Sequence, residues 1–127
     1  MVIHQSAEDY LETILILRER NGMVRSIDIV NELRFTKPSV SVAMKKLREN
    51  GYILTDRDGY ITLTEKGQAV ADRIYERHTV LTRVLVAIGV DKETAAADAC
   101  KIEHDLSDRT FARIKEYIEK HKISTAL

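Results

Sequence analysis

The chain has 127 residues, of which 44% are hydrophobic and 31% charged, and its 20 basic residues balance its 20 acidic ones. Such proportions indicate one ordinary globular domain, or two small lobes that share a core. No apolar run is long enough to cross a bilayer, no apolar signal segment follows Met1, and a single cysteine excludes an internal disulfide. We therefore expect a cytoplasmic protein with no membrane partner.

The first predicted helix runs from Ser6 to Arg20, because apolar residues recur at helical spacing between a capping serine and a terminating Asn-Gly pair. Asp9 and Glu12 stand three positions apart in this helix and share one face. Taken alone, they are well explained as solvated carboxylates that favour the helix dipole.

A DNA-binding motif is predicted next. A short helix over 27–33 begins after Ser26, and a third helix begins after Thr36 and stops at Gly51. The zero formal net charge argues against a nucleic-acid partner, but residues 34–48 contain basic side chains and no acid, and a phosphate backbone responds to local charge. Two helices joined by a short turn, with a basic second helix, predict a helix-turn-helix.

Two β-prone runs, 52–55 and 60–63, flank a loop that contains Asp58-Gly59, which predicts a hairpin. A hairpin directly after a helix-turn-helix is a wing, with Arg57 at its tip. The candidate DNA-contacting residues are Ser26, Thr36, Lys37, Pro38, Ser39, Ser41, Val42, Lys45, Lys46 and Arg57. A solvated helix face is the alternative, but basic charge, helix spacing and the wing together favour DNA.

Only helices are predicted after the hairpin. Thr64 caps a long one that contains His78, Asp91 caps the next, and Ser107 or Asp108 caps the last. A histidine alone on a helix is more often a surface residue than a ligand. The apolar stripes exceed what a winged helix needs to close its core, so we expect the surplus to form a homodimer interface.

Cys100, Glu103 and His104 stand at i, i+3 and i+4 in an alanine-rich predicted helix. This spacing puts a thiol, a carboxylate and an imidazole on one helix face, where they form a metal site or most of one. The triplet is equally compatible with a small buried cysteine beside two solvated polar residues, because so short a motif has low specificity.

Four motifs occur in order along the chain: Glu8-Asp9-Tyr10-Leu11-Glu12, Leu63-Thr64-Glu65-Lys66-Gly67, Arg77-His78 and Cys100-Lys101-Ile102-Glu103-His104-Asp105-Leu106-Ser107. With the winged-helix pattern, they make nearly the whole chain resemble the diphtheria toxin repressor family of metal-activated repressors, including its manganese transport regulator branch. The resemblance implies a mainly α fold, with a winged helix-turn-helix DNA-binding domain over 1–63 and a helical dimerisation and metal-binding domain over 64–127.

The same resemblance implies a short member that stops before the SH3-like domain of longer relatives. It implies a homodimer that binds a palindromic operator in double-stranded DNA with a divalent metal as corepressor, and that controls genes of metal homeostasis.

The implied metal ligands combine two branches of the family. Asp9, Glu12, His78, Glu103 and His104 match the manganese branch. Cys100 departs from that branch, which has a glutamate there, and matches the iron-responsive branch, which carries a methionine where this chain has Asp9. The ancillary site of the iron branch falls on Thr82 and Ala96 here, which are poor replacements, so we expect that site to be lost.

The implied cofactor is a divalent transition metal. Carboxylates suit Mn(II) and Fe(II), whereas a thiolate favours Fe(II), Co(II), Ni(II) or Zn(II). The mixed ligand set favours Fe(II) over Mn(II), with Zn(II), Co(II) or Ni(II) as substitutes in vitro. The sequence leaves open whether one or two ions bind each subunit.

Two other classes of function compete with this interpretation. One is a winged-helix regulator that responds to a small organic ligand or to oxidation of Cys100. The other is a metallo-hydrolase, but the chain has no H-E-x-x-H motif, nucleophile elbow or phosphate loop. We therefore expect neither enzymatic activity nor an organic substrate.

Overall fold

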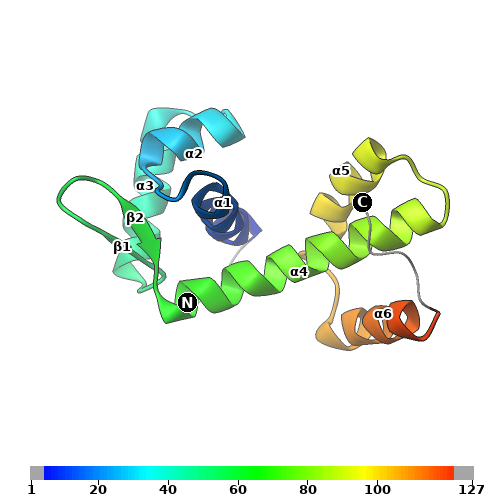
Figure 1. Ribbon diagram of the computed structural model, residues 1–127. Helices are drawn as coiled ribbons and strands as arrows, with labels where there is room; N and C mark the ends of the chain where they lie inside the picture. Colours follow the sequence, from blue (N-terminus) through cyan, green and yellow to red (C-terminus); the bar gives the residue numbers. More distant parts are fainter. Residues whose placement is uncertain (1–4, 122–127) are drawn as a thin grey trace. The chain divides into compact units, whose positions relative to one another are not determined.

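The computed structural model describes residues 5–121. Their elements are α1 (Gln5–Asn21), α2 (Ser26–Leu33), α3 (Lys37–Glu49), β1 (Ile53–Thr55), β2 (Ile61–Leu63), α4 (Glu65–Ala87), α5 (Lys92–Ile102) and α6 (Asp108–Lys120). This order confirms a mainly helical chain with a winged helix-turn-helix before a helical part (Figure 1). The contacts divide the chain into two compact units, one up to Asp72 and one from Arg73 onward, so that α4 contributes to both.

The first unit closes around one apolar core. Helix α1 contributes Leu11 and Ile14, both fully buried, because its apolar residues recur at helical spacing. Ile29 of α2 and Val40 of α3 are also fully buried, and Ile53 of β1 completes the same cluster. The two helices of the helix-turn-helix are therefore fixed on α1 by packing rather than by their short turn.

The wing is a two-stranded antiparallel hairpin in which Ile53 lies opposite Leu63. Its loop is ordered by Asp56, whose side chain accepts hydrogen bonds from the backbone N–H groups of Asp58 and Tyr60 at 2.9 Å each. The backbone of Ile61 donates to the carbonyl of Val24 at 2.7 Å, so the hairpin is also attached to the segment before α2. Figure 1 shows the hairpin projecting beyond these helices.

A tight junction joins the wing to α4 through the motif around Thr64. The Thr64 hydroxyl donates to the Gly51 carbonyl at 2.6 Å and accepts from the Gly67 N–H at 3.1 Å. Gly67 faces the Tyr52 carbonyl so closely that an added Cβ would lie 2.0 Å from that oxygen. Glycine is required here because a side chain would collide with backbone, which cannot rotate away.

The second unit contains the rest of α4 with α5 and α6. Asp91 and Ser107 cap the last two helices, as expected, by accepting hydrogen bonds from Thr94 N and Thr110 N. Val80 packs with Phe111 and Ile118 of α6 in a small apolar cluster. None of the described helices combines the length and the apolar character needed to span a membrane.

One expectation about this unit is wrong. Helix α5 ends at Ile102, and its C-cap residue Glu103 still donates to the Ala99 carbonyl at 2.9 Å, so that it is His104, in the turn beyond, that does not share a continuous helix face with Cys100. The Asp105 N–H bonds to the Ile102 carbonyl at 3.0 Å, which closes this turn. Contacts from α4, described below, hold the turn in place.

Candidate metal centre and DNA-binding surface

A donor cluster in the second unit contains His78 of α4, Cys100 of α5 and Glu103 of the turn after α5. Each residue offers one ligand atom, and these atoms all lie within 4.8 Å of one another. The cysteine is exposed, which argues against the alternative of a small buried cysteine. Nitrogen, thiol sulfur and carboxylate oxygen at this separation are a donor set suited to a divalent transition metal.

The Glu103 carboxylate lies between two other predicted ligands, His78 and His104. Its Oε2 is 2.9 Å from His78 Nδ1, and its Oε1 is 3.5 Å from His104 Nε2. The predicted triplet of Cys100, Glu103 and His104 is therefore split, because the two oxygens of Glu103 face different histidines. The thiol of Cys100, the carboxylate of Glu103 and the imidazole of His104 therefore do not converge on one point of a helix face, which the sequence pattern had suggested.

The burial of the Glu103 carboxylate is the strongest indication that this site binds a cation. Glu103 is 0% exposed, and across residues 5–121 its Oε1 accepts no hydrogen bond. Removing a carboxylate from water is costly unless positive charge or hydrogen bonds replace the lost hydration. The residues at this site therefore fit a divalent metal.

Neighbouring groups change the protonation of His78. Its contact with Cys100, and then its hydrogen bond to Glu103, raise the pKa of His78 from 6.5 to about 10, although burial acts in the opposite direction. At neutral pH the metal-free protein therefore holds His78 as an imidazolium that offsets the charge of Glu103. A ligating histidine must be neutral, so a metal has to displace this proton.

Two predicted ligands, Asp9 and Glu12, lie in α1 and so belong to the first unit. Asp9 is half-buried, and Glu12 is only 7% exposed. The expectation of two solvated carboxylates is therefore wrong for Glu12. That both ligate metal stays a prediction.

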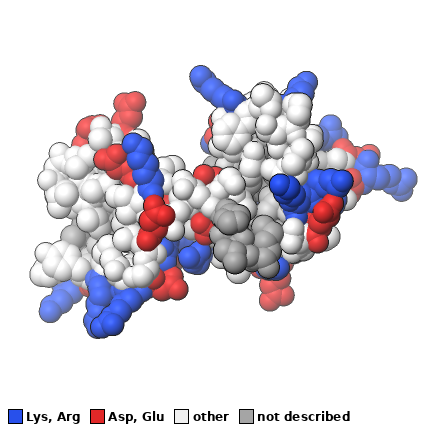
Figure 2. Space-filling view, turned by 180° about the vertical axis from the view of Figure 1, so that it is seen from behind, with Lys and Arg blue, Asp and Glu red and all other residues white. Residues whose placement is uncertain are grey.

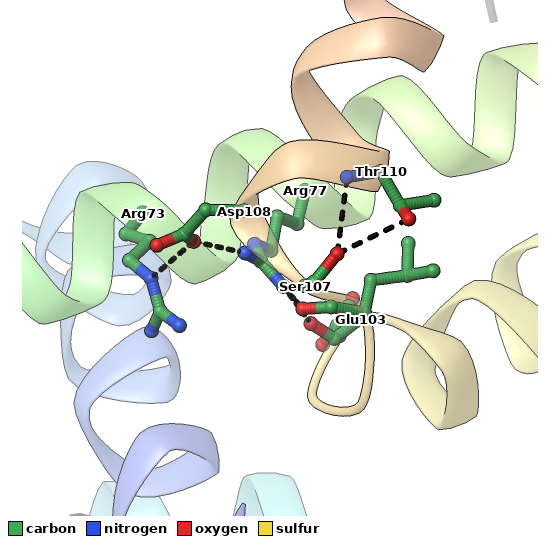
Figure 3. Close-up of polar contacts among 7 residues, drawn as sticks. Arg73, Arg77, Glu103, Ser107, Asp108 and Thr110 are labelled. Carbon is green, nitrogen blue, oxygen red and sulfur yellow. Dashed lines mark hydrogen bonds and ion pairs between the residues drawn. The ribbon is translucent and has the colours of Figure 1, made fainter.

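Arg77 holds the turn that carries Glu103 and His104. It is 1% exposed, and its guanidinium donates to the carbonyls of Glu103, at 3.1 Å, and Leu106 and to the Asp108 carboxylate (Figure 3). Sequence reasoning quoted Arg77 within a motif but gave it no role. Its place on the apolar stripe of α4 was the available indication, because a buried arginine requires partners.

The predicted DNA-contacting residues lie in the first unit, and most of them are exposed. Lys37, Pro38, Ser39, Ser41, Val42, Lys45, Lys46 and Arg57 are exposed, as is Thr36, whereas Ser26 is half-buried. The Thr36 hydroxyl accepts from Ser39 N at 3.2 Å and donates to the Ser39 hydroxyl at 2.8 Å, so it caps α3. Thr36 therefore fixes the start of α3, along which the exposed lysines lie.

A hollow of about 340 Å³ between α2 and α3 brings part of this set together. It is lined by Ser26, Ile27, Val30, Lys37 and Ser41. Basic and acidic side chains are interspersed on the face drawn in Figure 2, in keeping with the zero formal net charge. Within α3, Lys37, Lys45, Lys46 and Arg48 accompany a single acid, Glu49, so its basic character is a local property, as its sequence indicated.

Replacing Arg77 with Met should destabilise the metal-free protein by about 2–4 kcal/mol, because the buried carbonyl of Glu103 and the partly buried carbonyl of Leu106 lose their donor. Arg113→Met is the matched control, since exposed Arg113 makes only a surface pair with Glu116, at 2.8 Å, and should cost less than about 1 kcal/mol. Urea unfolding followed by circular dichroism measures both variants. Equal losses in the two variants would contradict the role assigned to Arg77.

Comparison with known proteins matches both parts of the chain to family models. Residues 3–69 match the family described as iron dependent repressor, N-terminal DNA binding domain, and residues 64–125 match its metal binding and dimerisation domain. An uncharacterised HTH-type transcriptional regulator of Methanocaldococcus jannaschii is 39% identical over 120 residues, which are 93% of this chain and 96% of that protein. The HTH-type transcriptional regulator MntR of Bacillus subtilis is 35% identical over 114 residues, 90% of this chain and 80% of that protein.

Among solved structures, a manganese-dependent transcriptional repressor in complex with manganese superposes with a TM-score of 0.81 at 29% identity. The match covers 89% of this chain and 52% of the other, so the chain spans about half the length of that repressor. Family matches over both units and identity above one third over most of the chain agree. The chain therefore belongs to the iron-dependent repressor family of transcriptional regulators, which is not a family of enzymes.

Proposed function

We propose that this chain is a transcriptional repressor that binds a palindromic operator as a homodimer when a divalent metal occupies the site around Glu103. The observation that carries the proposal is the buried Glu103 carboxylate grouped with His78 and Cys100, in a chain that also contains a winged helix-turn-helix. Fe(II) or Mn(II) is the proposed corepressor, and genes of metal-ion homeostasis are the proposed targets.

The proposed ligands combine the geometric cluster with residues assigned by resemblance. They are Asp9, Glu12, His78, Cys100, Glu103 and His104. When bound, a divalent cation supplies the positive charge that a group of carboxylates and a thiolate needs. Because Cys100 offers a sulfur donor, we favour Fe(II) over Mn(II), with Zn(II), Co(II) and Ni(II) as further ions that such a set accepts.

The chain's own residues define two protonation states of the site. Without a cation, the His78 imidazolium hydrogen-bonds to Glu103. Arg77, which lies in α4, holds the backbone of the turn that follows α5. With a cation, His78 would have to be neutral to ligate, and Glu103 would no longer depend on it for charge compensation. Asp9 and Glu12 belong to the first helix of the winged-helix unit, so their recruitment as ligands would make DNA binding depend on metal.

A redox-responsive regulator is the second candidate, because Cys100 is exposed and contacts His78. The two candidates differ in their response to a chelator. Removing divalent metal should release DNA from a metal-activated repressor. It should leave DNA binding by a purely redox-responsive regulator unchanged.

Replacing His104 with Ala should abolish the increase in DNA affinity that metal produces, because a predicted ligand beside Glu103 is lost. The helical content should stay the same, since His104 lies in a turn and not in a helix. Asp105→Asn is the matched control, because it alters an exposed carboxylate at the next position. Fluorescence anisotropy with labelled DNA, with and without Fe(II) or Mn(II), measures the response. An undiminished metal response in His104→Ala would remove His104 from the ligand set.

Metal affinity should rise with pH. Because the pKa of His78 is raised to about 10, each metal bound near neutral pH should release the His78 proton, and apparent affinity should increase by up to about tenfold per pH unit below that value. The free energy of unfolding of the metal-free protein changes with pH in the opposite direction. The stabilisation that His78 contributes is complete below pH 6.5 and is lost as pH rises through about 10.

Calorimetry in buffers of different ionisation enthalpy counts the protons released per metal. The control is His78→Gln, which retains a polar side chain of similar size without a titrating ring and should release about one proton fewer. Equal proton release by the two proteins would show that His78 is not protonated before metal binds.

A further inference from the structure

Arg25, just before α2, lies against the wing. Its guanidinium carbon is 4.2 Å from the centroid of the Tyr60 ring, which directly precedes β2. Its backbone is fixed as well, because Arg25 N donates to Asp28 Oδ2 at 2.9 Å and the Arg25 carbonyl accepts from Asp28 N at 3.0 Å. The residue therefore has little freedom in its backbone and a defined resting place for its side chain.

The charge of Arg25 has no carboxylate partner among residues 5–121. Two other exposed basic residues of the same unit are paired with carboxylates: Arg20 makes two hydrogen bonds to Glu32, at 3.0 and 3.1 Å, and Lys45 lies 3.9 Å from Glu49. An aromatic face orients a guanidinium but leaves its N–H donors available at the edges of the plane. Arg25 is thus an exposed arginine that is oriented without being neutralised.

The surroundings of Arg25 belong to the predicted DNA surface. Ser26, the next residue, lines the hollow between α2 and α3 together with Lys37. On its other side, Tyr60 belongs to the hairpin whose loop carries Arg57. Arg25 therefore connects the start of the helix-turn-helix with the wing, and each of these elements carries predicted DNA-contacting residues.

We propose that Arg25 binds a phosphate of the DNA backbone, and that the Tyr60 ring holds its guanidinium in the orientation that this contact requires. The inference rests on the proposed function, because it assumes that the first unit binds duplex DNA. It adds a contact that reads no base, since phosphate contacts fix position on the duplex and carry no sequence information. Arginine suits the role because its planar fork matches phosphate oxygens.

The test is the salt dependence of duplex binding by the full chain, loaded anaerobically with Fe(II) or Mn(II). A mixed-sequence duplex serves as the probe, because a phosphate contact does not depend on sequence. Arg25→Ala should weaken binding on the order of tenfold and lower the slope of log affinity against log salt by about 1 per protomer. Arg20→Ala is the matched control, because it removes the same charge from a residue that Glu32 already neutralises.

Two substitutions of Tyr60 separate orientation from general stability. Tyr60→Phe keeps the aromatic face and should behave like the wild type, whereas Tyr60→Leu should weaken binding in the same direction as Arg25→Ala. Thermal unfolding of each variant reports stability, which a structural role alone would change without altering the salt slope.

The outcomes distinguish this inference from the proposed function. Metal-loaded wild type that binds neither the mixed-sequence duplex nor any captured genomic fragment overturns both. Wild type that binds, with Arg25→Ala and Arg20→Ala showing equal salt slopes, overturns the role of Arg25 alone. A lower slope in Arg25→Ala than in Arg20→Ala supports the phosphate contact.

Discussion

The fully buried carboxylate of Glu103 sets the requirements for the second unit. A charge with no access to water must be compensated within the protein, and here the metal-free chain does so with a protonated His78 at 2.9 Å. The turn that carries Glu103 is held by buried Arg77, which donates to the carbonyls of Glu103 and Leu106, at its start and its end. Under the proposed function, the His78 proton supplies, before metal binds, the positive charge that the cation would later supply.

In the first unit, a small apolar core holds α3 and the wing in place. Fully buried side chains such as Leu11, Ile29 and Val40 join α1, α2 and α3. The wing is then fixed at its two ends, by the Val24–Ile61 hydrogen bond on one side and by the close approach of Gly67 to Tyr52 on the other. A hairpin of two short strands is marginal alone, so these attachments are what make it a usable surface.

Local chemistry made most of the fold predictable from the sequence. Thr36, Asp91 and Ser107 cap helices as expected, because a cap depends only on residues a few positions away. The end of α5 was missed, because the turn after it is held by Arg77 from a distant helix. The contact between Arg25 and Tyr60 was also missed, because the two residues are far apart in the sequence. The cluster of His78, Cys100 and Glu103 lay within the set that the family resemblance implied, whereas helical spacing alone suggested a different grouping.

Anaerobic capture of genomic DNA fragments by the purified chain tests the central claim most directly. Parallel samples would contain Fe(II), Mn(II), Zn(II) or a chelator, and the captured fragments would be sequenced. The account predicts that at least one of these metals, at the concentration found in cells, enriches a fragment with a palindromic site, and that the chelator abolishes the enrichment. Capture of the same fragments with and without metal would contradict it, and would make the cluster around Glu103 structural or redox-active.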